Sequence, residues 1–193
     1  MRTYPISEDQ LHDGAPTRGF FSYSIAKRTM AVHIEAIRKQ YGLDYCHLAV
    51  GNMYGSCDRF DKNSHFIATM MKEIHQARTT GQNHITLYGT GKPLRQFINA
   101  SDVALVIKQM IDRNIYESFN LTDDKNISVG EMAELILDVL GFNDILIQYD
   151  PDKPDGQYRK DVSIKKFRKV FPDFEFRNVR EGIKEMYRRN FDE

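Results

Sequence analysis

The stretch Tyr23-Ser24-Ile25-Ala26-Lys27-Arg28 opens an amphipathic segment around which the rest of the chain is organised. Apolar residues recur through it and Gly42 supplies the usual stop, which predicts a helix over residues 22–41. Tyr23 and Lys27 are four residues apart, so on a helix they share one face. An ammonium beside a phenol favours the ionised phenol, which suits proton transfer. A solvent-facing Tyr and Lys that share a face by chance are the alternative.

Strand and helix signals alternate after this segment. Short apolar or extended runs predict strands at residues 44–50, 85–88, 97–100, 118–121 and 145–149. Helix signals cover residues 65–79, a segment from Ser101, and residues 128–140, 163–170 and 179–191. Residues 1–22 and 51–63 are polar and glycine-containing, and are predicted to be loops. A helix, a glycine stop and a short apolar strand form half of a crossover, so we expect an α/β fold with a parallel sheet.

The composition excludes several classes of protein. Acidic and basic residues balance at 27 each, so no overall field attracts nucleic acid or a membrane surface. No apolar run is long enough to span a bilayer, and no secretory leader is recognisable. Cys46 and Cys57 define no disulfide framework and lack metal-ligand spacing to histidine. We therefore expect a cytoplasmic protein with reduced thiols and no metal site.

Five separated motifs point to one family. Tyr23-x-x-x-Lys27 is followed by Asn52-Met53-Tyr54-Gly55, Asn63-Ser64-His65, the turn of residues 88–97, and Lys153-Pro154-Asp155-Gly156. In this order they resemble the nucleotide-sugar branch of the extended short-chain dehydrogenase/reductase family, in particular the GDP-L-fucose synthases, over nearly the whole chain. The resemblance implies 3,5-epimerisation and NADPH-dependent 4-keto reduction of GDP-4-keto-6-deoxy-mannose, with NADP(H) as cofactor.

The resemblance also implies an architecture. The chain corresponds to the C-terminal part of a Rossmann-like parallel sheet plus a smaller α/β substrate-binding domain. Residues 1–52 and 96–126 are expected to form a partial NAD(P)-binding domain, and residues 53–95 and 127–193 the nucleotide-sugar domain. The helix that carries Tyr23 and Lys27 is expected to form a homodimer contact.

Catalytic and cofactor-binding roles follow from the resemblance. Tyr23 is the acid that protonates the C4 oxygen, and Lys27 holds the nicotinamide ribose. His65 reprotonates C3 and C5, a task suited to a group that titrates near neutral pH. Asn52 and Met53 contact the nicotinamide end of the cofactor, with Tyr23, Lys27 and His65. A helix-start His65 with a backbone partner is the structural alternative.

Substrate binding is expected from four further residues: Lys72, Tyr88, Arg95 and Asp155. A guanidinium such as Arg95 can hold a diphosphate through two parallel hydrogen bonds, and Tyr88 offers a stacking face, or is a core aromatic instead. Two positions depart from the family pattern. Gly51 replaces a hydroxyl-bearing residue, and Glu73 stands beside Lys72 where relatives carry a base, so that it would repel a diphosphate unless Lys72 takes over.

No stretch supplies the dinucleotide fingerprint, since the cluster Gly89-Thr90-Gly91 precedes Lys92-Pro93 rather than a helix. The segment that carries the family's catalytic Ser and Cys base is also absent. We therefore expect the chain alone not to turn over. Two other hypotheses stand beside this one. The chain is a non-catalytic remnant that binds a GDP-sugar or a partner, or it is another nucleotide-sugar epimerase or dehydratase.

Overall fold

The computed structural model describes residues 3–16, 18–62 and 64–191, so Asn63 of the third motif lies outside the described residues. The helices are the 3-10 helices η1 (Glu8–His12) and η2 (Arg18–Phe20), and α1 (Phe21–Tyr41), α2 (Phe66–Thr80), α3 (Ala100–Asp112), α4 (Val129–Leu140), α5 (Lys165–Val170) and α6 (Val179–Phe191). The strands are β1 (Leu48–Val50), β2 (Asn52–Tyr54), β3 (His84–Tyr88), β4 (Leu94–Arg95), β5 (Phe97–Asn99), β6 (Phe119–Leu121), β7 (Ile127–Ser128) and β8 (Leu146–Asp150). The predicted α/β organisation is confirmed.

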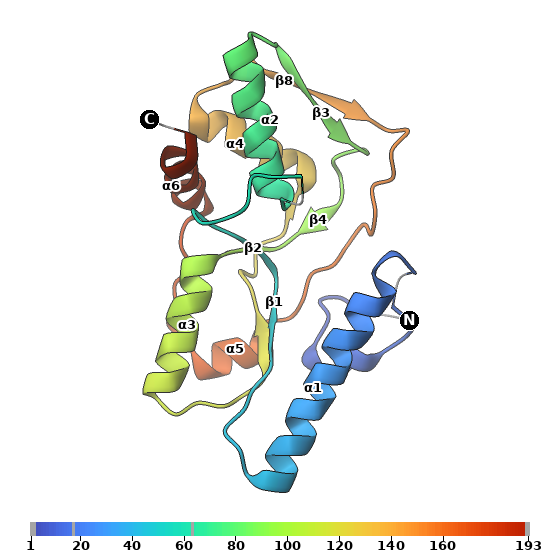
Figure 1. The fold of residues 1–193 in the computed structure, drawn as a ribbon, viewed down its shortest axis with the longest axis vertical. Helices are drawn as coiled ribbons and strands as arrows, with labels where there is room; N and C mark the ends of the chain where they lie inside the picture. The colour runs from blue at the N-terminus through green and yellow to red at the C-terminus, as the bar shows by residue number, and fades with distance from the viewer. Residues whose placement is uncertain (1–2, 17, 63, 192–193) are drawn as a thin grey trace.

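The strands pair mainly in parallel, as expected. β1 pairs with β6, β2 with β5 and β3 with β8 in parallel, whereas β4 and β7 are antiparallel. Between β1 and β2 the chain changes partner. The Gly51 N–H donates to the Leu121 carbonyl at 3.0 Å, and the Asn52 N–H donates to the Gln96 carbonyl at 3.3 Å. This switch brings β1 and β2 to the middle of the molecule (Figure 1).

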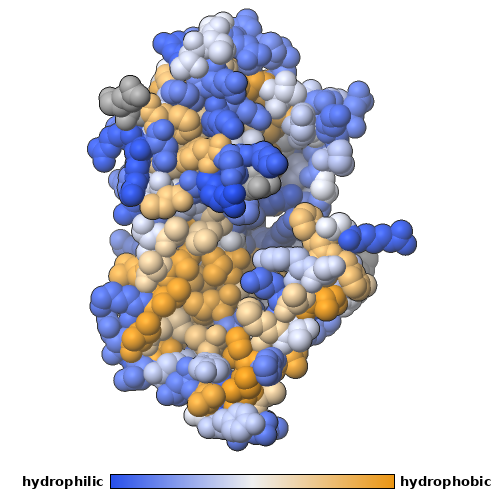
Figure 2. Space-filling model, in the orientation of Figure 1, coloured by the Kyte–Doolittle hydropathy of each residue, from blue (hydrophilic) through white to orange (hydrophobic). Residues whose placement is uncertain are grey.

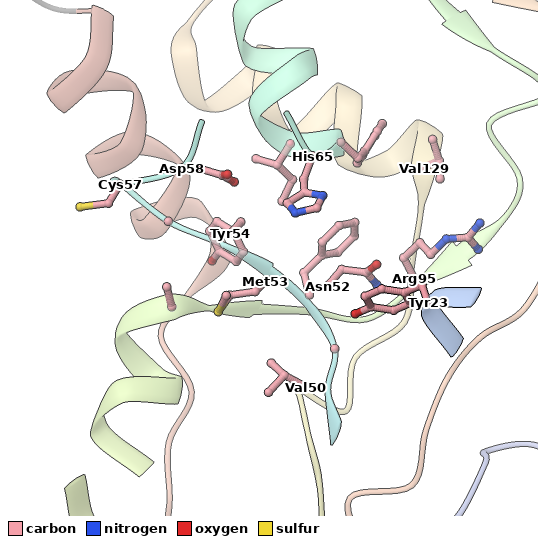
Figure 3. Close-up of a pocket in the computed structure, with 16 residues that line it drawn as sticks. Tyr23, Val50, Asn52, Met53, Tyr54, Cys57, Asp58, His65, Arg95 and Val129 are labelled. Carbon is pink, nitrogen blue, oxygen red and sulfur yellow. The ribbon is translucent and has the colours of Figure 1, made fainter. Parts of the chain in front are cut away.

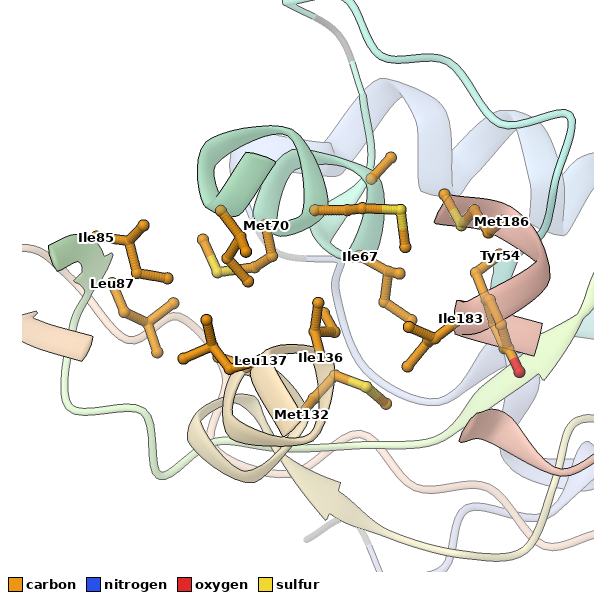
Figure 4. Packing of buried hydrophobic residues seen from close by; sticks show 14 of the residues in the cluster. Tyr54, Ile67, Met70, Ile85, Leu87, Met132, Ile136, Leu137, Ile183 and Met186 are labelled. Atoms are coloured by element: carbon orange, nitrogen blue, oxygen red, sulfur yellow. The ribbon is translucent and has the colours of Figure 1, made fainter. Parts of the chain in front are cut away.

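Two separate groups of buried residues form the interior. The first core joins α2, α4 and α6 to β3, and its fully buried side chains include Met71, Ile74, Ile136 and Ile183. Figure 4 shows these helices closing around the apolar side chains, with Tyr54 at one end. The capping box of Ser128 and Glu131, predicted from the sequence, fixes the start of α4 within this core.

The second core lies under β6, α3 and α5. Its centre is aromatic, since Phe167 of α5 contacts the rings of Phe119, Phe171 and Phe174. Residues 164–176 thus pack with the half that holds β1 and β6, although the sequence assigned them to the substrate-binding half. The division of the chain into two domains stays a prediction.

The helix α1 is poorly covered for its length. Ala31 is its one buried residue among those described, while Phe21, Ile25 and Val32 are exposed. Figure 1 shows α1 beside β1 at the edge of the molecule, and Figure 2 shows apolar side chains gathered over α3 and β1. Within the described residues β1 pairs with β6 alone, so its second edge is unpaired. Among the described helices, none combines the length and apolar character needed to cross a bilayer.

Several sequence-based boundaries were wrong. The strand predicted over residues 44–50 begins only at Leu48, because the segment before it makes no ladder. β2 falls inside a predicted loop. Of its three residues only Tyr54 is buried, while Asn52 and Met53 are exposed, so the sequence shows no apolar run that would indicate a strand. Residues 1–22 include η1 and η2 rather than irregular loop alone.

Candidate active site

A cleft of about 830 Å³ lies where α1, β1, β2 and the start of α2 meet. It lies at the carboxyl end of β1, where the chain changes strand partner, and such switch points are where ligands bind in open α/β sheets. Figure 3 shows Tyr23 and His65 directed into this cleft from two different elements. We call this cleft the main cleft. Its remaining lining residues are Val50, Gly51, Asn52, Met53, Tyr54, Gly55, Cys57, Asp58, Phe66, Ile67, Arg95, Phe97, Ala100 and Val129.

Tyr23 lies in the first turn of α1 and is 66% exposed. The Lys27 Nζ lies 5.6 Å from the centroid of the Tyr23 ring, so the two side chains contact one another as their helical spacing predicts. Lys27 itself does not line the main cleft among the described residues. The ammonium group therefore lies over the Tyr23 ring, while Tyr23 itself lines the main cleft.

His65 is the N-cap residue of α2, as its position at a loop-to-helix junction predicted. Its side chain makes no capping hydrogen bond, while its carbonyl accepts from the Thr69 N–H at 2.8 Å. The backbone thus holds His65 in place and the imidazole is left exposed toward the main cleft. This arrangement suits a group that exchanges protons with a ligand.

Asn52, Met53 and Arg95 also line the main cleft. The Asn52 Nδ2 donates to the Gln96 carbonyl at 2.7 Å, which leaves its amide oxygen able to accept from a ligand. The Arg95 Nη1 donates to the Leu94 and Gln157 carbonyls at 2.7 and 2.9 Å. Burial lowers the pKa of Arg95, and the fixed guanidinium keeps further N–H donors for an anion.

A second cleft, of about 490 Å³, lies between α2 and β3 and is called the side cleft. Phe66 and Val129 line both clefts, so the two adjoin. Tyr88, 66% exposed at the end of β3, lines the side cleft with the Lys153 Nζ 5.8 Å from its ring centroid. The remaining residues that line it are Ser64, Thr69, Met70, Glu73, Gln76, Gln82, His84, Ile85, Thr86 and Leu87.

Lys72 does not join the other expected substrate residues. It is exposed and lines neither the main nor the side cleft among the described residues, whereas its neighbour Glu73 lines the side cleft. Burial raises the pKa of Glu73, although nearby Lys72 opposes that shift. Adjacent residues on a helix point about 100° apart, so only one of the two can face the cleft.

Asp155 closes a turn instead of lining a cleft of the described residues. Its carboxylate accepts from the Thr90 N–H at 2.6 Å and from the Thr90 hydroxyl at 2.7 Å. These donors lower the pKa of Asp155. Gly89, at a φ of +80°, allows this approach, because a Cβ there would lie 2.2 Å from Asp155 Oδ1. Two motifs that are distant in sequence are thus joined beside Tyr88.

Cys57 and Asp58 line the main cleft but were given no role from the sequence. The sequence offered no signal for them, because β2, the strand that precedes them, was itself predicted as loop. In Figure 3 the Cys57 sulfur is directed away from His65. Asp58 Oδ1 accepts from the Arg59 N–H at 2.8 Å, so this carboxylate shapes the loop.

Comparisons with known proteins identify the family of the chain. The model of the NAD dependent epimerase/dehydratase family matches residues 2–122, more than half of the chain. The chain belongs to this family. The parallel α/β strand pairing agrees with the Rossmann-like fold of this family.

Similar relatives within the epimerase/dehydratase family are named as GDP-L-fucose synthases. The GDP-L-fucose synthase of Dictyostelium discoideum is 33% identical over 95% of this chain and 58% of its own length. A probable GDP-L-fucose synthase of Drosophila melanogaster is 31% identical over 99% of this chain and 63% of its own length. A GDP-L-fucose synthetase from Naegleria fowleri, solved bound to NADP, has a TM-score of 0.85 and 27% identity over 97% of this chain and 60% of that one. The chain thus spans about 60% of the length of these relatives.

Proposed function

We propose that the chain is GDP-L-fucose synthase-like and acts in the 3,5-epimerisation and 4-keto reduction of GDP-4-keto-6-deoxy-mannose, with NADP(H) as cofactor. The single observation that carries the proposal is that Tyr23 and His65, far apart in sequence, line one cleft. The names of the similar relatives supply the substrate class. A phenol and an imidazole at one cleft provide the two proton-transfer groups that the two reactions need.

In the reduction, Tyr23 donates a proton to the C4 oxygen of the sugar. Bound NADPH supplies the hydride that the carbon receives. Lys27, in contact with the Tyr23 ring, is assigned to the ribose hydroxyls of the cofactor. The apolar side chains of Val50 and Met53 and the amide of Asn52 fit the nicotinamide end.

In the epimerisation, His65 returns a proton to C3 and then to C5 of the 4-keto sugar. Each proton is acidic because the adjacent ketone stabilises the resulting anion, and its removal is assigned to a base outside this chain. Arg95 and Tyr88 are assigned to the diphosphate and nucleoside portions, since they line the two adjoining clefts.

The isolated chain is proposed not to turn over. No described helix follows a turn with several glycines in register, the feature that holds a dinucleotide pyrophosphate. Together with the unpaired edge of β1, this favours a second candidate, a GDP-sugar-binding protein without activity of its own. We further propose a homodimer through the exposed apolar face of α1 and a cytoplasmic location, in which Cys46 and Cys57 remain free thiols.

The test co-expresses the chain with the N-terminal segment of the Dictyostelium relative and follows NADPH oxidation with GDP-4-keto-6-deoxy-mannose. Solvent deuterium incorporation at C3 and C5 reports epimerisation separately. Tyr23→Phe should abolish reduction and keep exchange, and His65→Asn should abolish exchange. Tyr41→Phe and His33→Asn, both exposed on α1, are the matched controls.

Unchanged exchange in His65→Asn would favour another epimerase or dehydratase activity. Tight GDP binding without any turnover of the completed protein would favour the binding protein. Micromolar NADPH binding and turnover by the chain alone would contradict the proposed need for a second segment.

A further inference from the structure

The side cleft has the chemistry of a recognition site. It adjoins the main cleft at Phe66 and Val129, so one ligand can extend from one cleft into the other. Its walls carry a carboxylate, Glu73, and the amides of Gln76 and Gln82. The ring of Tyr88 lies at the end of β3, which forms another side of this cleft.

Glu73 is a half-buried carboxylate without a hydrogen-bond donor among the described residues. The neighbouring Lys72, which is exposed, partly offsets its charge. Burial raises the pKa of Glu73, so its negative charge is poorly compensated within the chain. A half-buried carboxylate without donors leaves its oxygens able to accept hydrogen bonds from a ligand.

β3, which forms a wall of the side cleft, also has one edge unpaired within the described residues. Within the described residues β3 pairs with β8 alone, and residues 84–88 of β3 line the side cleft. An unpaired strand edge presents backbone N–H and C=O groups that can bond to a planar ligand. The amides of Gln76 and Gln82 supply donors, so the side cleft offers donors and acceptors at one site, with the Glu73 carboxylate as its strongest acceptor.

We infer that Glu73 selects guanine as the base of the nucleotide-sugar, an inference that rests on the proposed function. Guanine presents N1–H and the 2-amino group side by side, which match the two oxygens of a carboxylate. Uracil offers a single N–H between two carbonyls, and the corresponding nitrogen of adenine is an acceptor. The Glu73 charge also repels a diphosphate, which leaves the phosphates to Arg95 and Lys153.

The experiment measures the binding of GDP, IDP, ADP and UDP to the full chain by calorimetry. IDP differs from GDP only in the missing 2-amino group. We expect the chain to prefer GDP over IDP by about tenfold or more, as for a hydrogen bond to a charged group. Glu73→Gln should reduce that preference to about twofold or less. Glu134→Gln, an exposed carboxylate of α4 outside the side cleft, should keep it.

The outcomes separate this inference from the proposed function. Equal binding of GDP and IDP by the unmodified chain, a retained preference in Glu73→Gln, or no GDP binding would overturn the guanine assignment. Turnover of the completed protein with such a result would leave the proposed function intact. Because Glu73 accepts no hydrogen bond from described residues, Glu73→Gln should melt at or above the temperature of the parent, and a lower value would indicate a structural role.

Discussion

Gly51 lies at the switch between β1 and β2, and its replacement by alanine tests why glycine stands there. A Cβ at this position would lie 2.4 Å from Thr122 Oγ1 and 2.7 Å from Thr122 Cβ. Thr122 is fully buried, and Oγ1 has no hydrogen-bond partner among the described residues. The Thr122 side chain thus occupies the space that a side chain at position 51 would need. Gly51→Ala should cost about 1–3 kcal/mol, the usual range for overpacking.

The matching change is Thr122→Gly, which removes both clashing atoms. It also removes a buried, unsatisfied hydroxyl, which stabilises the fold by about 1–3 kcal/mol. Glycine gives the unfolded chain more backbone freedom, which destabilises the fold by about 0.5–1 kcal/mol. The double variant Gly51→Ala/Thr122→Gly should therefore regain most of the stability that Gly51→Ala loses. We expect a coupling free energy of about 1–3 kcal/mol.

Urea unfolding followed by circular dichroism gives the free energy of unfolding of the parent, the two single variants and the double variant, provided that their m-values agree. Gly19→Ala is the control, because a Cβ at Gly19 has no atom within 4 Å. It should change the free energy of unfolding by less than about 0.5 kcal/mol. Additivity of the two single changes within about 0.5 kcal/mol would refute the steric account of Gly51.

Three further predictions concern the interior and one turn. Burial raises the pKa of Tyr54 to about 12. Unfolded tyrosine has a pKa of about 10. The contribution of Tyr54 to the free energy of unfolding is therefore fully present below that pH and is lost as pH rises toward the folded pKa, with a loss of about 1.4 kcal/mol at about pH 11. Tyr54→Phe should lose this alkaline decline in urea unfolding. Phe167→Ala should cost about 3–5 kcal/mol in the same assay, because Phe167 is fully buried at the centre of the second core. The lowered pKa of Asp155 means that its contribution is present at neutral pH and is lost as pH falls through that lowered value. Asp155→Asn should therefore speed amide exchange at Thr90 at neutral pH and remove its acid dependence.

The sequence predicted the elements whose signals are local. The helix with Tyr23, the capped start of α4 and the N-cap position of His65 follow from spacing and capping chemistry, and all appear in the fold. Their convergence on one cleft depends on strand pairing across the chain, which periodicity does not encode. The motif order supplied that expectation instead.

What the sequence could not give is side-chain direction at single positions. Lys72 and Glu73 differ by one step on a helix, and the packing of α2 decides which one faces the side cleft. The contact of Asp155 with substrate stays a prediction, and its hydrogen bonds to Thr90, which close a turn, were not foreseen from the sequence. β2 escaped prediction because its three residues acquire strand character only by pairing with β5.

The bare edge of β1 has a practical consequence for anyone who handles this polypeptide. Within the described residues one edge of this short strand has unpaired amides and carbonyls, and it lies beside the apolar surface over α3, so other chains can add to it as further strands. Purified preparations should therefore become turbid more readily as concentration rises, and a peptide that extends the ladder in parallel should keep them clear.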